Sequence, residues 1–246
     1  MYNLEKCPDF GGFMKDFNIT ETAKEVFDIE SNSILELKNR VGENFTKAIE
    51  ILCSIKGKVV VTGMGKSGLI GRKIASTLCS TGTPAVYLHP AESTHGDSGI
   101  IGKQDAVIAI SNSGETAELL NLLPLINRFN VPIVALVGNS NSTLAQKSEA
   151  VLDISVAKEA CPLNKAPTAS TTATLAMGDA LAVCLLEKRG FTKEDFLMFH
   201  PSGKLVKGLT YKVVDLMITG DRMPVVSDSL SFTSVLSSNT VPSKSL

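Results

Sequence analysis

The chain has 246 residues, of which 24 are Lys or Arg and 25 are Asp or Glu, giving a formal net charge of −1. A balance so close to neutral provides no basic surface for a phosphodiester backbone, so we expect no nucleic-acid partner. The hydrophobic share of 43% can form a real core, and the length fits one domain of about 200 residues plus a smaller remainder.

The N-terminal segment, residues 1–17, carries Glu5, Asp9 and Asp16 and has no charged stretch followed by an apolar one. It therefore lacks the pattern of a secretory signal. No apolar run approaches the roughly 18 residues that a membrane-spanning helix needs, so we expect a cytoplasmic protein with no membrane partner. The five widely spaced cysteines include no Cys-x-x-Cys pair, which predicts neither disulfides nor a thiolate zinc site.

Two amphipathic helices are predicted next, at 20–41 and 45–55. A short β-branched run at 58–62 then enters the glycine-rich segment Gly63–Gly68, and apolar residues at helical spacing follow as far as Leu78. This order predicts a strand, a turn and a helix.

Short apolar strands continue to alternate with helical segments, which is typical of a buried parallel sheet covered by helices. A long Ala- and Leu-rich helix is expected at 169–188, with Gly190 to end it, and a last helix at 192–199, with Thr192 as its cap and Pro201 as its stop. We expect strands at 58–62, 85–88, 106–110, 133–137 and 151–154, and a further helix at 115–129.

The glycine-rich segment matches G-x-G-x-x-G, which by itself suggests a dinucleotide-binding turn. That interpretation needs an acidic residue at the end of the second strand, where this chain has Leu88-His89-Pro90, and a nucleotide P-loop would need glycine in place of Val60. The pattern instead predicts a turn that presents backbone N–H groups, Lys66 and Ser67 to a smaller anion.

A second polar loop, Ser111–Thr116, also lies where a predicted strand enters a helix. Its three hydroxyls, the free backbone amides and the positive end of the helix dipole can together bind a phosphate group without an arginine. N-capping alone is the alternative, but it needs a single hydroxyl. A further hydroxyl cluster opens the long helix, where we expect Ser170 or a neighbour to act as the cap and the others to line a pocket: Thr168, Thr171, Thr172 and Thr174.

With these loops the chain resembles the sugar isomerase (SIS) domain family, and more closely its bacterial arabinose-5-phosphate isomerases. The resemblance covers roughly residues 20 to 220. The segments that carry it are Gly63–Gly68, Ser80–Pro84, His95–Asp97, Ile110–Glu115, Ala157–Pro162, Ser170–Thr174 and His200–Gly203.

The resemblance implies an α/β fold, a three-layer α/β/α sandwich around a five-stranded parallel sheet of the flavodoxin-like or Rossmann-like kind. It implies the interconversion of D-ribulose 5-phosphate and D-arabinose 5-phosphate through an enediol, which supplies Kdo for lipopolysaccharide or capsule synthesis. Two alternatives stay open: another SIS isomerase acting on a heptose or hexulose phosphate, and a non-catalytic phosphosugar-sensing module. Against the sensor, residues 1–55 contain no basic helix-turn-helix segment.

An aldose–ketose isomerisation needs a base to move the proton and a group that polarises the carbonyl. The resemblance places the catalytic residues at Lys66, Glu118, Glu159 and His200, and we favour Glu118 as the base with Glu159 as the second choice. Lys66 is suited to hold either the phosphate or the enediolate oxygen. The expected substrate contacts are Ser67, Gly82, Thr83, His95, Ser111, Asn112, Ser113 and Thr116.

Enediol chemistry of this kind requires no metal or other cofactor, although the resemblance marks His89 as a contact for an inhibitory zinc ion. It also implies a homo-oligomer, a tetramer, in which His200 reaches a neighbouring subunit's site. We expect an N-terminal extension at 1–19, the SIS domain at 20–210 and, at 211–246, the truncated start of a cystathionine-β-synthase (CBS) domain, too short to fold alone and poorly ordered.

Overall fold

The computed structural model describes residues 18–199 and the short stretches 214, 217–220, 227, 229–231 and 233–234. The chain divides into two units, Met1–Phe196 and Leu197–Leu246, of which the first contains the sheet. The proposed CBS-like segment lies mostly outside the described residues, as do Pro201 and most of the N-terminal extension. The three expected segments and the two boundaries between them therefore stay predictions.

Five parallel strands form the sheet, in the order β2-β1-β3-β4-β5. This confirms the predicted α/β class and the flavodoxin-like arrangement of strands. The chain leaves β1 toward β2 on one side and returns to pair β3 on the other, so the direction of winding switches between β1 and β3. The strands are β1 (Val59–Gly63), β2 (Ala85–Leu88), β3 (Ala106–Ser111), β4 (Ile133–Val137) and β5 (Ala150–Asp153).

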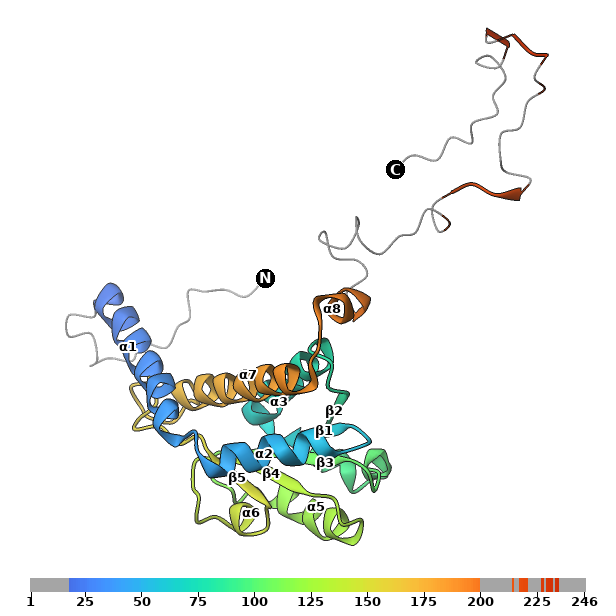
Figure 1. The fold of residues 1–246 in the computed structure, drawn as a ribbon. Coiled ribbons are helices and arrows are strands. Elements are labelled where there is room, and N and C mark those ends of the chain that lie inside the picture. Colours follow the sequence, from blue (N-terminus) through green and yellow to red (C-terminus); the bar gives the residue numbers. More distant parts are fainter. Residues whose placement is uncertain are drawn as a thin grey trace, which may run out of the picture. The chain divides into compact units, whose positions relative to one another are not determined.

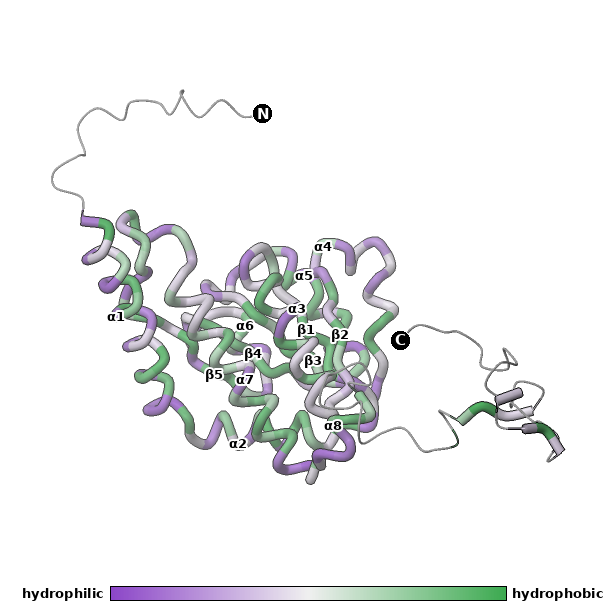
Figure 2. The backbone as a smooth tube through the Cα atoms, turned by 90° about the horizontal axis from the view of Figure 1, so that it is seen from above, coloured by the Kyte–Doolittle hydropathy of each residue, from purple (hydrophilic) through white to green (hydrophobic). Residues whose placement is uncertain are grey.

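Helices cover both faces of this sheet (Figure 1). Alternate strand residues point to opposite faces, so Val59 and Val61 belong to one hydrophobic cluster and Val60 to the other. The first cluster packs against α1 (Ile19–Leu37), α2 (Glu43–Ser54), α3 (Gly65–Ser80) and α7 (Ala169–Arg189). The second packs against α5 (Ala117–Arg128) and α6 (Thr143–Gln146). The result is the expected three-layer sandwich, with the hydrophobic strands at its centre (Figure 2).

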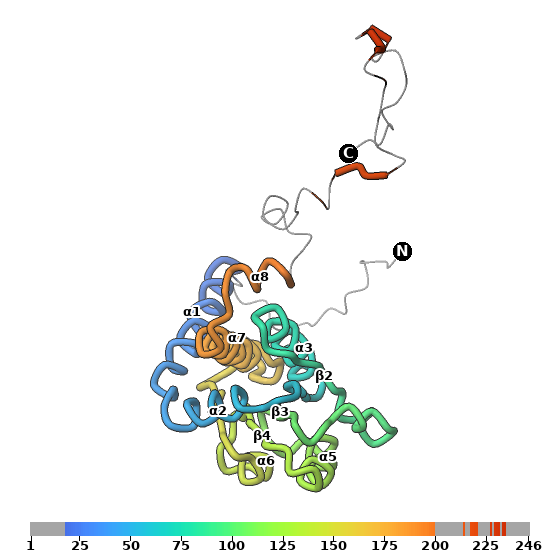
Figure 3. The backbone as a smooth tube through the Cα atoms, turned by 45° about the vertical axis from the view of Figure 1, so that its right-hand side comes forward, coloured from blue at the N-terminus to red at the C-terminus, as the bar shows by residue number. Residues whose placement is uncertain are grey.

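The long helix α7 lies beside α1 and α3 (Figure 3). Gly178 makes the approach to α3 possible, because a Cβ there would overlap the buried side chain of Ile74. Within the described part of the chain, α7 is the one helix long and apolar enough to cross a membrane, and half of that stretch is buried inside the protein. Its packing against neighbouring helices explains its apolar composition as that of a core helix.

Most element boundaries agree with the sequence predictions to within two residues. Gly190 ends α7 in the left-handed conformation, with φ of 64°. The Thr192 hydroxyl accepts a hydrogen bond from the Asp195 N–H at 3.1 Å, which confirms it as the cap of α8 (Lys193–Phe199). Three short elements were not predicted, because four residues are too few for a periodic pattern: α4 (Pro90–Ser93), η3 (Asp97–Ile100) and α6. The 3-10 turn η2 (Lys38–Arg40) continues α1.

Asp105 joins the beginnings of β1 and β3. Its side chain is 4% exposed and accepts hydrogen bonds from Lys58 N at 2.9 Å, Lys58 Nζ at 2.8 Å and Gly102 N at 2.8 Å. Burial raises the pKa of the Asp105 carboxyl, but the hydrogen bonds from Lys58 and Gly102 outweigh burial and hold this pKa below its ordinary value. The charged carboxylate therefore stabilises the folded sheet.

The substitution Asp105→Asn should lower the free energy of unfolding by about 2 kcal/mol at neutral pH, because a buried charge-assisted contact is lost. The contribution of the wild-type carboxylate is present above its unfolded-state pKa of about 4 and disappears as the pH falls through the lower folded-state pKa. Urea unfolding of both proteins across this range should therefore show the difference closing at acid pH. Asp179→Asn, which breaks an exposed ion pair with Lys73, is the control and should change stability little; an equal loss in both variants would contradict the role given to Asp105.

Candidate functional site

The candidate site lies at the edge of the sheet where the parallel strands end. Gly63 at the end of β1 is paired with Ile110 of β3, so the glycine-rich loop and the serine loop start side by side. Ligands of open α/β sheets bind at this edge, at the point where the winding direction switches. The fold thus brings together the two loops that the sequence marked as anion sites.

The glycine-rich loop is held by Tyr87 on the neighbouring strand. The Tyr87 hydroxyl donates a hydrogen bond to the Gly63 carbonyl oxygen at 2.7 Å. A Cβ on Gly68 would lie 2.5 Å from this carbonyl oxygen and 2.5 Å from the Tyr87 hydroxyl, so glycine is required for the approach. The guanidinium of Arg72 lies 4.3 Å from the centre of the Tyr87 ring. The sequence reasoning missed Tyr87, because nothing local connects it to a loop 24 residues earlier.

Lys66 and Ser67 lie in the first turn of α3, directly after this loop. No side chain caps this helix, whose N-cap residue is Met64. The side chain of Lys66 is exposed and forms no hydrogen bond or ion pair with any residue in the described part of the chain. The first-turn N–H groups of α3 therefore lie at the edge of the sheet without a capping side chain, and the charge of Lys66 beside them is unpaired among the described residues.

The hydroxyls of the serine loop partly bind one another. Ser111 is buried, its Oγ lies 2.9 Å from Thr116 Oγ1, and it accepts a hydrogen bond from Gly114 N at 3.0 Å. Ser113 accepts one from Glu115 N at 3.2 Å. Thr116 is the N-cap residue of α5, yet its side chain makes no capping hydrogen bond. N-capping therefore does not account for the hydroxyls, and the N-terminus of a second helix stays uncapped beside the first.

Glu118 lies in the first turn of α5 and is half-buried. Its carboxylate forms no hydrogen bond or ion pair with the residues that the structure describes. A carboxylate without a protein partner, one turn from the serine loop, is free to take a proton from a molecule bound there.

Glu159 has the opposite environment, because it binds the N-terminus of α7. Its Oε2 atom accepts hydrogen bonds from Thr168 N at 2.7 Å, Thr168 Oγ1 at 3.0 Å and Ser170 N at 3.2 Å. The residue in the N-cap position is Thr168, a neighbour of Ser170 as expected, but its side chain makes no capping hydrogen bond and Ser170 lies inside the helix. The carboxylate of Glu159 takes the part predicted for a local hydroxyl.

These contacts change the acidity of Glu159. Partial burial raises the pKa of its carboxyl, but the hydrogen bonds from Ser170 and Thr168 outweigh burial and leave the pKa below its ordinary value. Glu159 is therefore ionised throughout the neutral range. It borders a cavity of about 410 Å³ between the segment after β5 and α1, which is also lined by Thr22, Glu25, Val26, Ile29, Lys158, Ala160, Cys161, Pro162 and Asn164.

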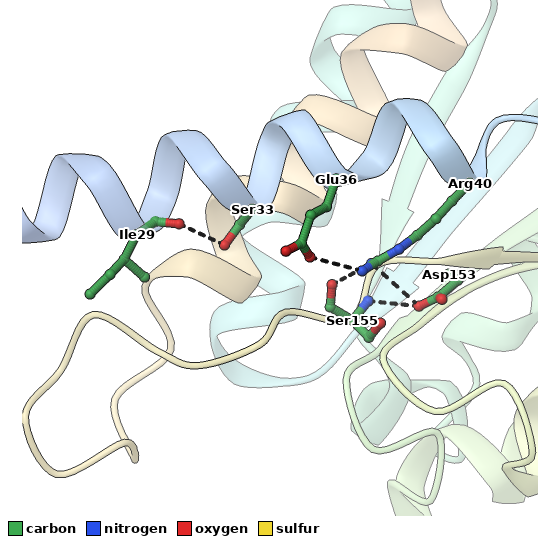
Figure 4. A network of polar contacts seen from close by, with 6 residues as sticks. All are labelled: Ile29, Ser33, Glu36, Arg40, Asp153 and Ser155. Carbon is green, nitrogen blue, oxygen red and sulfur yellow. Dashed lines mark hydrogen bonds and ion pairs between the residues drawn. The ribbon is translucent and has the colours of Figure 1, made fainter.

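Arg40 fixes the beginning of the segment that carries Glu159 (Figure 4). Its guanidinium donates hydrogen bonds to the Ser155 carbonyl oxygen and, at 3.2 Å, to Glu36 Oε2, and lies 3.7 Å from Asp153 Oδ1. Asp153 in turn accepts a hydrogen bond from Ser155 N at 2.8 Å. The end of α1 and the end of β5 are thereby tied to the same segment.

Two expected substrate contacts do not reach this site within the chain. Gly82 and Thr83 precede β2, so they lie at the opposite edge of the sheet from the strand ends. A Cβ on Gly82 would overlap the ring of Phe191, and Thr83 is completely buried, with a hydroxyl that has no partner. Within one chain the length of β2 separates these two positions from the strand ends, so the substrate contacts at Gly82 and Thr83 stay a prediction.

The three histidines differ in their positions and in their exposure to solvent. His89 follows β2 at the correct edge, and its buried Nδ1 has no hydrogen-bond partner. His95 is exposed after α4, and the described residues do not include His200. Among those residues, no group of three or more His, Cys, Asp and Glu side chains is placed to hold a metal ion. The zinc contact at His89 stays a prediction.

Comparison with known proteins gives one consistent family. The SIS domain model matches residues 51–184. Arabinose 5-phosphate isomerase KdsD of Pseudomonas aeruginosa is 50% identical over 222 residues, which cover 90% of this chain and 68% of the relative. KdsD of Escherichia coli K12 is 51% identical over 220 residues, covering 89% and 67%. The solved structure of c3406 from Escherichia coli CFT073 in complex with arabinose 5-phosphate has a TM-score of 0.73 and 39% identity, and the match covers 76% of this chain and 100% of that chain.

The serine loop depends on Gly114, whose φ is +69° and whose Cβ position would overlap the buried Ser142 hydroxyl. Gly114→Ala should therefore lower the free energy of unfolding by about 2–4 kcal/mol, from left-handed strain and overpacking together, and weaken phosphate binding. Urea unfolding and calorimetric titration with inorganic phosphate measure the two effects. Gly42→Ala, at a position with no neighbour within 4 Å, is the control; unchanged stability and phosphate affinity in Gly114→Ala would contradict the need for glycine.

Proposed function

Because the chain belongs to the SIS-domain family, we infer that it is an aldose–ketose isomerase that interconverts D-ribulose 5-phosphate and D-arabinose 5-phosphate. The observation that carries this conclusion is the 50% identity to arabinose 5-phosphate isomerase KdsD across 90% of the chain. The strand-end site agrees with it, because its two loops offer hydroxyls and uncapped helix N-termini to a phosphate, and the carboxylate of Glu118, unpaired among the described residues, lies one turn from the serine loop.

The phosphate group is proposed to bind between the serine loop and the first turn of α3. The uncapped N-termini of α3 and α5 follow the neighbouring strands β1 and β3, and each supplies free N–H groups and a positive dipole end. The hydroxyls of Ser67, Ser111, Ser113 and Thr116, with the Asn112 amide, provide further donors. Lys66 adds a positive charge for the phosphate or for the enediolate oxygen, and His95 is proposed to contact the substrate from the loop after α4.

Glu118 is proposed as the base that moves the proton. In the direction from aldose to ketose it takes the proton from C2 of the open-chain sugar while the C1 carbonyl oxygen gains one, which gives the enediol. Return of a proton to C1 and loss of the proton on the C2 oxygen complete the ketose. The free carboxylate of Glu118 suits this exchange, whereas Glu159 is already bound to α7 and presents an ionised oxygen to a sugar hydroxyl.

We also propose that the reaction uses no metal or other cofactor and that the protein works in the cytoplasm. Its product would supply Kdo synthesis. A homo-oligomer, in which the partner completes each site through His200, would also cover the exposed apolar residues Phe27 and Leu35 of α1, which are 72% and 58% exposed.

Glu118→Gln keeps the shape of the side chain but cannot accept the proton, so kcat should fall by about 10²- to 10⁴-fold while phosphate binding persists. An NMR time course with D-ribulose 5-phosphate and no added metal measures the product, and calorimetry measures phosphate binding.

The matched control is Glu187→Gln, which changes an exposed glutamate in the last turn of α7. Turnover retained in Glu118→Gln would move the base to Glu159 or a histidine; binding without turnover in the wild type on pentose, heptose or hexulose phosphates would indicate a sensor.

Shared sites predict complementation between two inactive variants. Glu118→Gln and His200→Ala, each inactive alone, should regain part of the activity when their subunits are mixed, because some mixed oligomers then contain one complete site. Activity is measured after denaturation and joint refolding, with each variant refolded alone as the control. Mixed oligomers that stay inactive would show that each site takes both residues from one chain.

A further inference from the structure

The segment that carries Glu159 is fixed at both ends. Arg40 ties its beginning to α1, and Thr168 joins its end to the first turn of α7. Between these points the backbone N–H of Glu159 donates a hydrogen bond to Asn164 Oδ1 at 2.8 Å, which holds a local turn together. The carboxylate of Glu159 is therefore not placed by its own backbone alone, and Thr168 contacts it with both its N–H and its hydroxyl.

The hydroxyl of Thr168 both donates and accepts a hydrogen bond. It donates to Glu159 Oε2 at 3.0 Å and accepts from Ala160 N at 2.9 Å, so its rotamer and its proton are both fixed. The Thr168 N–H donates to the same oxygen at 2.7 Å. With the bond from Ser170 N, three donors converge on Oε2, which leaves Oε1 as the oxygen with acceptor capacity to spare. One carboxylate oxygen is thus held by the protein and the other is suited to a ligand.

Other charged groups face this position from two sides. On α1, Glu25 lies 3.7 Å from Lys158, and this pairing reduces the effect of both charges on Glu159. Glu30, also on α1, accepts a hydrogen bond from Thr172 Oγ1 at 2.9 Å. The thiol of Cys161 lines the same cavity, and backbone N–H groups of Ala166 and Lys165 hold its pKa below the ordinary value. This thiol ionises at a higher pH than the carboxyl groups, so its ionisation does not overlap with the titration of Glu159.

We propose that Thr168 is a positioning residue for Glu159, whose hydroxyl and N–H hold one carboxylate oxygen at the N-terminus of α7 and leave the other oxygen for the substrate. The inference rests on the proposed function, in which Glu159 acts in the isomerase reaction. Thr168 itself need not touch the substrate. The chemistry required is a hydroxyl that donates to the carboxylate while it accepts from the chain, which serine supplies and valine does not.

The test compares Thr168→Val with Thr168→Ser in kcat for arabinose 5-phosphate isomerisation. Thr168→Val removes one of the three hydrogen bonds that hold the carboxylate of Glu159, so kcat should fall by about tenfold, as expected for the loss of one hydrogen bond to a charged group. Thr168→Ser should restore kcat. Thr77→Val is the control, because it removes a half-buried hydroxyl that is bonded to the Lys73 carbonyl oxygen within α3; its kcat should equal that of the wild type.

A direct titration makes the result independent of turnover. The ¹³C signal of the Glu159 carboxyl, assigned with Glu159→Gln, should titrate below the ordinary range of glutamate in the wild type and higher in Thr168→Val. An unchanged kcat in a folded Thr168→Val, or an ordinary Glu159 pKa in the wild type, would overturn the inference. If Thr168→Val does not fold, the wild-type titration decides. A wild type that titrates as expected but does not isomerise pentose phosphates would instead contradict the proposed function.

Discussion

The parallel pairing of β1 with β3 is the constraint on which the site depends. It aligns Gly63 with Ile110, so two loops almost 50 residues apart in sequence begin at adjacent points of one edge. Because both following helices run back from this edge, each of them begins at this edge as well. Asp105 secures the opposite ends of the same two strands through Lys58 and Gly102. The pairing is therefore fixed at both ends, and the position of the loops follows from it.

An anion site built from helix ends suits a chain with a net charge of −1. Backbone N–H groups and hydroxyls are neutral donors, and they cost less to hold near a buried surface than a cluster of arginines would. They also have a fixed direction, which the Tyr87 hydroxyl bond and the tight contacts at Gly68 and Gly114 impose. The side chain of Lys66 is exposed and adds the positive charge beside these neutral donors.

The two carboxylates differ because their surroundings differ. Glu118 has no partner in the described chain, whereas Glu159 holds the first turn of α7 and is kept ionised by it. Different environments give two carboxyl groups in one site different proton affinities, so that the two groups can have different chemical roles. Helix α7 accordingly joins stability and function: its buried face packs on α1 and α3, and its first turn fixes a carboxylate beside a cavity.

The sequence by itself determined the strands, the longer helices, the parallel sheet and the two polar loops that follow β1 and β3, because periodicity and glycine or serine turns are local properties. It also selected Glu118 and Glu159 through the resemblance. Only the tertiary structure decided which marked residues meet. Gly82 and Thr83 belong to a motif but lie at the edge of the sheet opposite the strand ends, and the contact of Arg40 with Ser155 joins residues 115 positions apart. A side-chain capping bond for α7 was expected from a local hydroxyl and comes from Glu159, nine residues before Thr168. Such contacts are set by how elements pack, and no local pattern records the packing partner.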